Sequence, residues 1–457
     1  MSLSNSLCDH LRLVLPTGIN RRFVVAYSGG IDSQVLLHLM VSFVAGQTSR
    51  LRMVHIDHGL HKESQGWAEW CAETASEFGI EIVVLKINES PPSGCSVEAW
   101  ARGHRYRLLE STMEADDVLL TAHHQNDVAE TFLLQLLRGA GPHGLSSIAE
   151  RQRFGSGMML RPLLNYSRAD IVSYAEAHNL EWIDDSSNDE DRYDRNYLRS
   201  NVFPWIERRW PAAVARIGHA VELQQNAAAC LDEAADAVIE NGLGTEDSQL
   251  SISCICNLNA AMQRSVLRRW IVRAGFPKPD AVHLHEIRRL INARIDAQPC
   301  VRWKCAEIRR YRDSLFLLWQ TERIAGTGDY HWDLTAPLYL PWGVLSTNAS
   351  IGKGLSAKLA MSNDVSVRFR AGGERCHPIY RARSQSLKRL FQEWGIPPWL
   401  RGEIPLIYRG NELIAVAGKC ICRGFGAENG EKGIILQWVR SDRLNRLGIA
   451  TQNIEDT

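Results

Sequence analysis

The chain has 457 residues, and its 52 Lys and Arg are balanced by 52 Asp and Glu, so net charge alone indicates no partner. This length favours about three domains, and a hydrophobic fraction of 45% is ordinary for a globular protein. No apolar run is long enough to cross a membrane, and the N-terminus lacks the basic and then apolar pattern of a signal peptide. We therefore expect a cytoplasmic protein without a membrane partner.

The cysteines are scattered along the chain, and no CxxC motif occurs. In a long cytosolic chain this usage predicts reduced thiols rather than disulfides. Two pairs, Cys254/Cys256 and Cys420/Cys422, are spaced to share one face of a strand. No zinc-ligand spacing accompanies them, so the sequence leaves their role open.

The first 200 residues alternate between short apolar runs and helical patterns. This order predicts an α/β fold with a doubly wound parallel sheet, in which ligands bind at the carboxyl ends of the strands. The predicted strands are Phe23–Ala26, Met53–Ile56, Ile80–Ile87 and Val118–Thr121, and the predicted helices are Ser33–Phe43, Ser64–Phe78, Ser96–Glu114 and Asp127–Arg138.

A small, glycine-rich turn joins the first strand to the first helix of this pattern. It consists of Ser28, Gly29, Gly30, Ile31, Asp32 and Ser33. Such a turn directs several backbone N–H groups and the positive end of a helix dipole at one point, which is a phosphate-binding geometry. Neither the Walker pattern nor the dinucleotide pattern fits these residues. The six residues match SGGxDS, the pyrophosphate loop (PP-loop) of enzymes that cleave ATP between its α and β phosphates.

Three more motifs carry polar residues in the same region. Asp57 ends the second strand, where a doubly wound fold meets the base and ribose of a nucleotide. Arg102 and Arg105 share a helix face and could clamp phosphates, although a solvent-exposed basic face is an equal alternative. In DDSSND, residues 184–189, carboxylates could recognise an amine and the following Arg195 and Arg199 could meet phosphate, unless the segment is a plain surface loop.

The segment TAHHQNDVAET, residues 121–131, follows the fourth strand. If a helix begins near His123, then His123, Asp127 and Glu130 fall on one stripe of it. An imidazole and two carboxylates beside an ATP site suit metal binding and proton transfer from an attacking amine. A polar helix start capped by Asn126 or Asp127 is the alternative.

The rest of the chain has a different character. A long alanine-rich pattern, 212–241, predicts a connecting helix, and two smaller α+β domains are expected after it. The predicted division is a catalytic ATP-binding domain at 1–215, a helical linker with a small α+β domain at 216–325, and a C-terminal α+β domain at 345–445. Arginine clusters at 288–312 and 368–389 suit phosphate backbones, or they are solvated faces.

The later elements are predicted from the same patterns. Gly326–Asp329 and Ala336–Trp342 are interpreted as a linker. The predicted helices are Asn257–Ala274, Pro279–Ala293 and Ser386–Trp394, and the predicted strands are Val301–Ile308, Ser314–Trp319, Val365–Phe369, Ile404–Tyr408, Glu412–Ala417 and Ile434–Val439.

Taken together, these motifs resemble the tRNA(Ile)-lysidine synthase family within the ATP pyrophosphatase (PP-loop) superfamily. The resemblance is dense over the first 200 residues and returns in Arg381–Gly418. His61 departs from the family, which often has arginine there. The motifs that carry it are SGGIDS (28–33), HIDHGL (55–60), ARGHRY (101–106), TAHHQNDVAET, LLRGAG (136–141), RPLL (161–164) and DDSSND.

The resemblance implies a ligase that uses ATP to adenylate C2 of the wobble cytidine in the CAU anticodon of tRNA(Ile). The amine of free L-lysine then displaces AMP, which changes codon specificity from AUG to AUA and tRNA identity from Met to Ile. It further implies that Ser28–Ser33 and Asp57 bind ATP and that Asp32 and Asp127 bind Mg²⁺. The implied catalytic residues are Asp32, Arg102, Arg105, His123, Asp127 and Glu130.

Three alternatives remain at this stage. A tRNA thiolase of the same superfamily would need reactive cysteines, and none of the motifs contains one. An amide-forming enzyme acting on a small carboxylate would leave the basic C-terminal domains without a role. A non-catalytic RNA-binding protein with a vestigial nucleotide site would not need Asp32, Asp127 and Glu130. The sequence gives neither the oligomeric state nor the general base.

Overall fold

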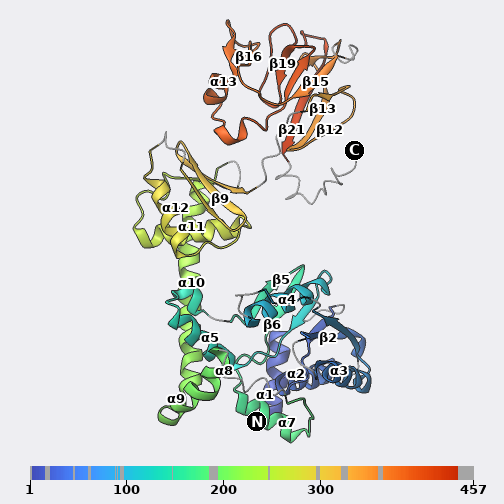
Figure 1. Ribbon diagram of the computed structural model, residues 1–457, viewed down its shortest axis with the longest axis vertical. Coiled ribbons are helices and arrows are strands. Elements are labelled where there is room, and N and C mark those ends of the chain that lie inside the picture. Colours follow the sequence, from blue (N-terminus) through green and yellow to red (C-terminus); the bar gives the residue numbers. More distant parts are fainter. Residues whose placement is uncertain are drawn as a thin grey trace. The chain divides into compact units, whose positions relative to one another are not determined.

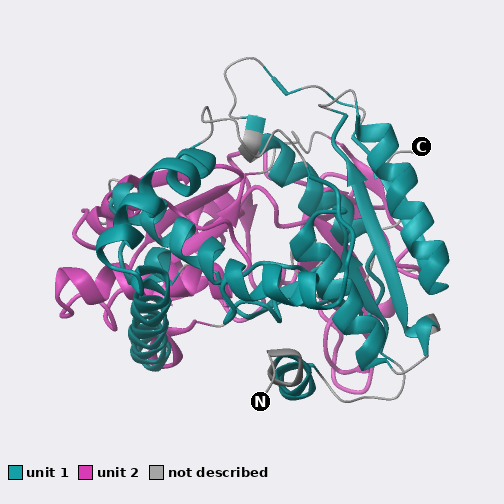
Figure 2. Ribbon diagram, turned by 90° about the horizontal axis from the view of Figure 1, so that it is seen from below, with its two compact units in different colours: residues 1–238 teal, residues 239–457 magenta. Residues whose placement is uncertain are grey.

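The computed structural model describes residues 3–15, 21–44, 47–59, 63–87, 89, 91–92, 97–146, 148–184, 194–244, 247–294, 299–320, 328–358 and 364–440. The chain divides into two compact units, residues 1–238 and 239–457 (Figure 2). In the described part of the chain, no helix is both long enough and apolar enough to span a membrane.

Unit 1 is built around a six-stranded sheet, of which β2, β5 and β6 are labelled in Figure 1. The order of its strands is β3-β2-β1-β4-β6-β5. Strand β1 pairs in parallel with both β2 and β4, and only the edge strand β5 runs antiparallel. Its strands are β1 (Phe23–Ala26), β2 (Leu51–Asp57), β3 (Glu81–Lys86), β4 (Val118–Leu120), β5 (Arg151–Phe154) and β6 (Gly157–Leu160). The predicted doubly wound parallel sheet is confirmed, with the β5–β6 hairpin as an unpredicted extension.

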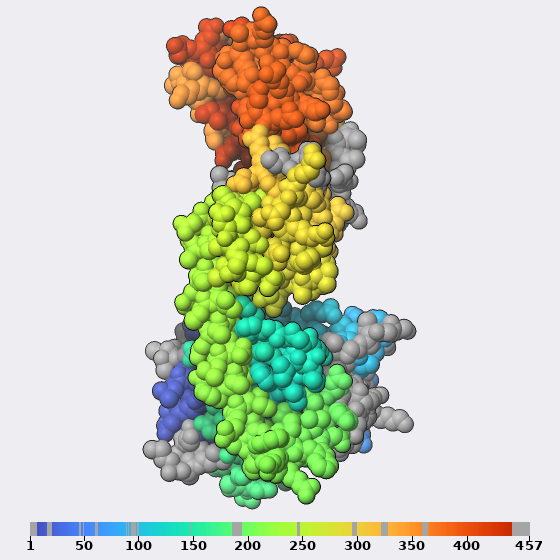
Figure 3. All heavy atoms as spheres, turned by 90° about the vertical axis from the view of Figure 1, so that its left-hand side faces the viewer, coloured from blue at the N-terminus to red at the C-terminus, as the bar shows by residue number. Residues whose placement is uncertain are grey.

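Helices cover both faces of this sheet. Alternate residues of β1 explain why: Phe23 and Val25 enter one buried cluster, whereas Val24 enters another on the opposite face. The helices of the unit are α1 (Leu3–Val14), α2 (Ile31–Phe43), α3 (Ser64–Phe78), α4 (Val97–Ser111), α5 (Gln125–Leu137), α6 (Pro142–Leu145), α7 (Arg168–Ala177), α8 (Asp194–Tyr197), α9 (Phe203–Arg209) and α10 (Ala213–Gly242). Residues of α9 and α10, in green, form part of the surface shown in Figure 3.

The strand order determines where a ligand can bind. From β1 the chain adds β2 and then β3 on one side, and it returns to add β4 on the other side of β1. The carboxyl ends of β1 and β4 therefore flank the point at which the direction of winding reverses. Helices diverge from such a point and leave a crevice there. The loops after β1 and β4 are the predicted phosphate loop and the TAHHQNDVAET segment.

Unit 2 consists of antiparallel sheets with a few helices. In the four-stranded sheet β7-β10-β9-β8, strands β8 and β9 contact α12, which in turn contacts α11. Three further sheets have the orders β11-β15-β18-β19-β20, β12-β13-β21-β14 and β16-β17. The elements are β7 (Gln249–Ser251), α11 (Ala260–Arg273), α12 (Ala281–Ile291), β8 (Cys300–Trp303), β9 (Ala306–Tyr311), β10 (Ser314–Trp319), β11 (Tyr330–His331), β12 (Leu338–Leu340), β13 (Gly343–Ile351), β14 (Leu355–Ser356), β15 (Val365–Arg368), β16 (Arg375–Cys376), β17 (Gln385–Ser386), α13 (Leu387–Glu393), β18 (Leu406–Arg409), β19 (Glu412–Val416), β20 (Cys420–Ile421) and β21 (Lys432–Arg440).

Three expectations about this half of the chain are corrected. The run 301–308 is not one strand but the hairpin of β8 and β9, because Lys304 turns the chain with a φ of +46°. The supposed linker 336–342 contains β12, and the other supposed linker, 326–329, lies only partly within the described residues. Cys254 and Cys256 lie in a turn after β7, where each thiol donates to a backbone carbonyl rather than sharing a strand face.

Candidate active site

The loop between β1 and α2 is braced by its own hydroxyl groups. The Ser33 hydroxyl donates to the carbonyl of Gly30 at 2.8 Å and lies 3.2 Å from the Ser28 hydroxyl. Gly29 has a φ of +86°, and a Cβ on it would lie 2.6 Å from Cδ1 of Ile183. The backbone N–H of Ile183 also donates to the Gly29 carbonyl at 2.9 Å. The positive φ favours glycine here, and an added Cβ would also displace the end of the Ile183 side chain. The first N–H groups of α2 have no partner within the helix, so they are available for an anion.

A pocket of about 710 Å³ opens at the carboxyl ends of β1, β2 and β4. That size is typical of a site for a small molecule or nucleotide. Predicted site residues that line it are Ser28, Asp32, Ser33, Asp57, Arg105, His123 and Asp127. Gly29, Gly30, Ile31, Arg102 and Glu130 are not among the lining residues.

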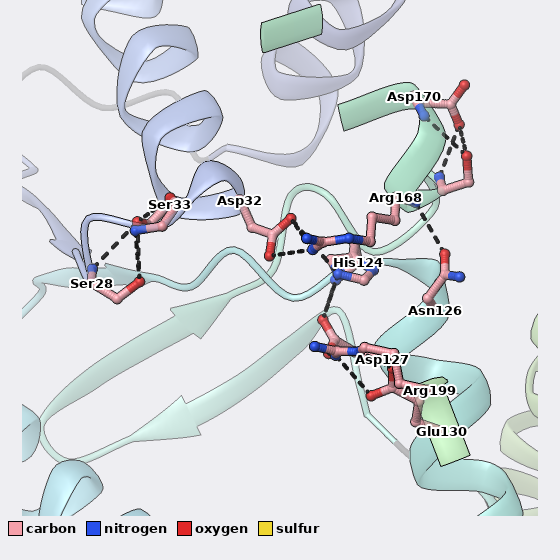
Figure 4. Close-up of polar contacts among 12 residues, drawn as sticks. Ser28, Asp32, Ser33, His124, Asn126, Asp127, Glu130, Arg168, Asp170 and Arg199 are labelled. Atoms are coloured by element: carbon pink, nitrogen blue, oxygen red, sulfur yellow. Dashed lines mark hydrogen bonds and ion pairs between the residues drawn. The ribbon is translucent and has the colours of Figure 1, made fainter. Parts of the chain in front are cut away.

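Two carboxylates of this pocket face the same imidazole (Figure 4). Nε2 of the buried His124 lies 3.8 Å from an oxygen of Asp32 and 3.5 Å from an oxygen of Asp127. Burial raises the pKa of Asp32, although His124 and Arg168 oppose the rise. Burial alone would also raise the pKa of Asp127, but His124 and Arg195 lower it to about 2. Asp127 therefore stays ionised in neutral solution.

The helix after β4 begins at Gln125, with His124 as the preceding cap residue. His123 therefore lies in the loop before the helix. The prediction that His123, Asp127 and Glu130 share one stripe of the helix is wrong for His123. His123 nevertheless lines the pocket, and its Nδ1 lies 2.8 Å from the Thr121 hydroxyl. Burial lowers the pKa of His123 to about 3, so this imidazole is neutral at pH 7. Asp127 accepts the backbone N–H of His124 at 2.9 Å, as the capping alternative predicted.

Glu130 lies one turn further along α5 and is only 1% exposed. One of its oxygens accepts from Nε of Arg195 at 2.6 Å and the other from Nε of Arg199 at 2.7 Å. Arg195 also contacts Asp127 at 3.2 Å. In this structure Arg195 and Arg199 bind carboxylates of α5. Glu130 thus orients the arginines that hold Asp127.

The remaining predicted residues fall at the edges of the pocket. Arg102 and Arg105 on α4 both stack on the ring of Tyr106, at 5.1 and 5.7 Å, and only Arg105 reaches the pocket lining. Asp57 is 7% exposed and accepts the backbone N–H of Gly59 at 2.7 Å. Residues 60–62 and 185–193, which include His61 and most of the DDSSND motif, lie outside the described residues.

Sequence reasoning missed three residues of the site. His124 stood in the quoted motif without a role, and Asn126 entered only as a possible cap. Arg168 was not singled out, yet its Nη1 lies 3.3 Å from Asp32 and its backbone N–H donates to Asn126 at 3.0 Å. A signal was available, because Ser167 and Asp170 have the spacing of a capping box and mark Arg168 as the first residue of a helix.

Comparisons with known proteins were made with this geometry in hand. Family models match three stretches: a PP-loop domain at residues 7–206, a TilS substrate binding domain at 250–316 and a TilS substrate C-terminal domain at 365–438. A tRNA(Ile)-lysidine synthase of Coxiella burnetii is 40% identical over 425 residues, 93% of this chain and 94% of that protein. A tRNA(Ile)-lysidine synthase of Alkalilimnicola ehrlichii is 37% identical over 430 residues, 93% of this chain and 95% of that protein.

Among solved structures, the U34-tRNA thiolase NcsA from Methanococcus maripaludis matches with a TM-score of 0.41 and 16% identity. The match covers 49% of this chain and 79% of that one, a similarity too low to bear on function.

Proposed function

The chain belongs to the tRNA(Ile)-lysidine synthase family, and from that premise we propose that it ligates lysine to C2 of the wobble cytidine in tRNA(Ile) with a CAU anticodon. ATP is consumed, and AMP and pyrophosphate are released. The observation that carries the proposal for this chain is the pocket itself. It brings a phosphate-binding loop, two carboxylates and a neutral imidazole to the crevice of a PP-loop sheet.

The first step would use the loop Ser28–Ser33 to hold the triphosphate. The backbone N–H groups at the start of α2 face the β and γ phosphates, and the adenosine extends along the end of β2 towards Asp57. The C2 oxygen of the cytidine attacks the α phosphorus while the bond to the bridging oxygen breaks. The electron pair of that bond leaves with pyrophosphate. A cytidine in a single-stranded anticodon loop reaches such a pocket at low cost, because it has little stacking to lose.

In the second step the lysine amine attacks C2, and AMP leaves. The amine must lose a proton as the new bond forms. Asp127 already accepts from Arg195 at 3.2 Å and lies 3.5 Å from Nε2 of His124. His123 is neutral and lines the same pocket, and the phosphate charges of a bound nucleotide would raise its basicity. We assign proton acceptance to His123 and attraction of the lysine ammonium group to Asp127.

A magnesium ion is implied by the superfamily, and the residues fit it. Mg²⁺ is usually held by one or two carboxylates together with substrate phosphates. Asp32 and Asp127 supply that set beside the phosphate loop. Nδ1 of the buried His124 between them has no hydrogen-bond partner among the described residues. Bound there, the ion would neutralise charge on the phosphates. No group of three or more His, Cys, Asp or Glu in the described ranges is arranged as a metal centre.

The remaining assignments concern the tRNA, the cellular compartment and the rival chemistry of sulfur transfer. We propose that the arginine clusters of 288–312 and 368–389 bind the tRNA phosphates and that the protein acts in the cytoplasm. Sulfur transfer is disfavoured, because none of the described residues that line the pocket is a cysteine. Cys71 is buried behind it, with its Sγ 3.4 Å from Nδ1 of His55, and burial raises the pKa of that thiol to about 12.

The test is lysine incorporation. The full chain is incubated with labelled lysine, ATP and unmodified tRNA with a CAU anticodon, and labelled tRNA and AMP are measured. The wild type is expected to form both, whereas Asp32→Ala should form neither. Asp9→Ala serves as the matched control, since Asp9 is an exposed carboxylate paired with Arg12 on α1. Incorporation of sulfur instead of lysine, or ATP consumption without tRNA, would reject the proposal.

A further inference from the structure

Arg168 is an arginine on a fixed backbone with a loosely held side chain. It is the first residue of α7, where Ser167 and Asp170 form a capping box, and its own N–H donates to Asn126 on α5 at 3.0 Å. These bonds fix its Cα relative to α5. The side chain is 43% exposed, so the guanidinium remains free to reorient.

The contact between Arg168 and Asp32 has the geometry of a weak ion pair. Nη1 of Arg168 lies 3.4 and 3.3 Å from the two oxygens of Asp32. Strong charge-assisted hydrogen bonds are shorter, at about 2.7–2.9 Å. The pairs of Glu130 with Arg195 and Arg199 meet that standard, at 2.6 and 2.7 Å, on a carboxylate that is almost fully buried. A competing anion can therefore displace the Arg168 pair more easily than the two pairs of Glu130.

The place of the Arg168–Asp32 pair in the fold indicates which anion could displace Asp32 from Arg168. Asp32 is the second residue of α2 and belongs to the loop to which the proposed function assigns the triphosphate. Figure 4 shows Arg168 reaching Asp32 from the side opposite Ser28 and Ser33. A guanidinium presents a planar fork of donors that matches phosphate oxygens, which a compact ammonium does not. The ligand that fits this place is the pyrophosphate part of ATP.

We infer that Arg168 binds the β and γ phosphates of ATP and stabilises the departing pyrophosphate, resting on Asp32 when the loop is empty. The inference rests on the proposed function. When the bond between the α phosphorus and the bridging oxygen breaks, that oxygen takes the electron pair, and the charge on pyrophosphate grows. A guanidinium already in contact with these oxygens lowers the energy of that charge. Release from Asp32 also frees this carboxylate.

A purely structural role is the competing explanation, because Arg168 also links the start of α7 to α2. Binding measurements separate the two, since AMP lacks the β and γ phosphates. Arg168→Ala and Arg168→Lys are compared with the wild type by calorimetry against ATP, pyrophosphate and AMP, with Mg²⁺ and without tRNA. Arg12→Ala is the matched control, because Arg12 forms an exposed pair with Asp9 on α1.

Arg168→Ala is expected to weaken binding of ATP and pyrophosphate by about 10- to 100-fold, the range for loss of a hydrogen bond to a charged group, and to leave AMP binding unchanged. Arg168→Lys should recover part of the loss, and Arg12→Ala should change nothing. Equal weakening of ATP and AMP, or no weakening of either, overturns the inference. Absence of ATP binding by the wild type would instead overturn the proposed function.

Discussion

Removing the charge of Glu130 should lower the free energy of unfolding of unit 1 more than it lowers the rate of lysine incorporation. Glu130→Gln removes the negative charge from an almost fully buried side chain that accepts from Arg195 and Arg199 at 2.6 and 2.7 Å. A hydrogen bond to a charged group contributes roughly 1.5–3 kcal/mol. Two factors reduce the loss. The arginine side chains are 19% and 33% exposed, so solvent screens their charges, and the amide oxygen of the glutamine can still accept a hydrogen bond from one of them. We expect a loss of about 2–4 kcal/mol.

For a unit of this size the loss corresponds to a melting temperature lowered by roughly 5–15 °C. Differential scanning calorimetry of the full chain measures it, with the exposed Glu69→Gln on α3 as control. Lysine incorporation should fall only in part at temperatures where the variant is folded, because Glu130 acts through Arg195 and Asp127. An unchanged melting temperature together with abolished incorporation would refute this reasoning and place Glu130 in contact with a substrate.

Two further predictions follow from the same site. The pKa of Asp127 is lowered from 3.8 to about 2, so the stabilisation from its ionised form is present above pH 4 and is lost as pH falls towards 2. Unfolding free energies of the wild type and Asp127→Asn should therefore differ by about 2 kcal/mol at pH 6 and converge in acid, and a pH-independent difference would contradict this. Gly29→Ala should weaken ATP binding about tenfold, because its Cβ would push Cδ1 of Ile183 away from the loop and would strain a backbone with a φ of +86°. Gly79→Ala, with a φ of +64° and open space around it, should leave ATP binding intact in the same calorimetric titration, and similar losses in both variants would show that backbone strain alone is responsible.

Local patterns predicted much of the catalytic fold. The apolar runs of β1, β2 and β4 and the glycine-rich turn are contiguous in sequence, so hydrophobic periodicity and turn chemistry suffice to find them. The edge hairpin of β5 and β6 was missed. Three of the four β5 side chains are exposed, so that strand carries little apolar signal. Helix ends were predicted less well than helix positions. Because α5 begins at Gln125, His123 lies in the preceding loop and not on the helix.

The unpredicted part of the site consists of contacts between distant segments. Arg168 meets Asp32 across 136 residues, and Arg195 meets Glu130 across 65. No local pattern encodes such a partner, because the fold alone brings α7 and α8 to the starts of α2 and α5. The sequence suggested phosphate as a ligand of Arg195 and did not single out Arg168, and in the structure both contact carboxylates of the same chain.

The hydrogen bond from Ile183 to the carbonyl of Gly29 joins the phosphate loop to residues 180–184. A ligand that displaces those residues would also act on the loop that we propose to hold ATP, and the converse holds. Thermodynamic reciprocity then requires that ATP and a ligand that displaces residues 180–184 change each other's affinity by the same factor. A mutation at 182 or 184 that never touches ATP should thus be detectable in a nucleotide titration.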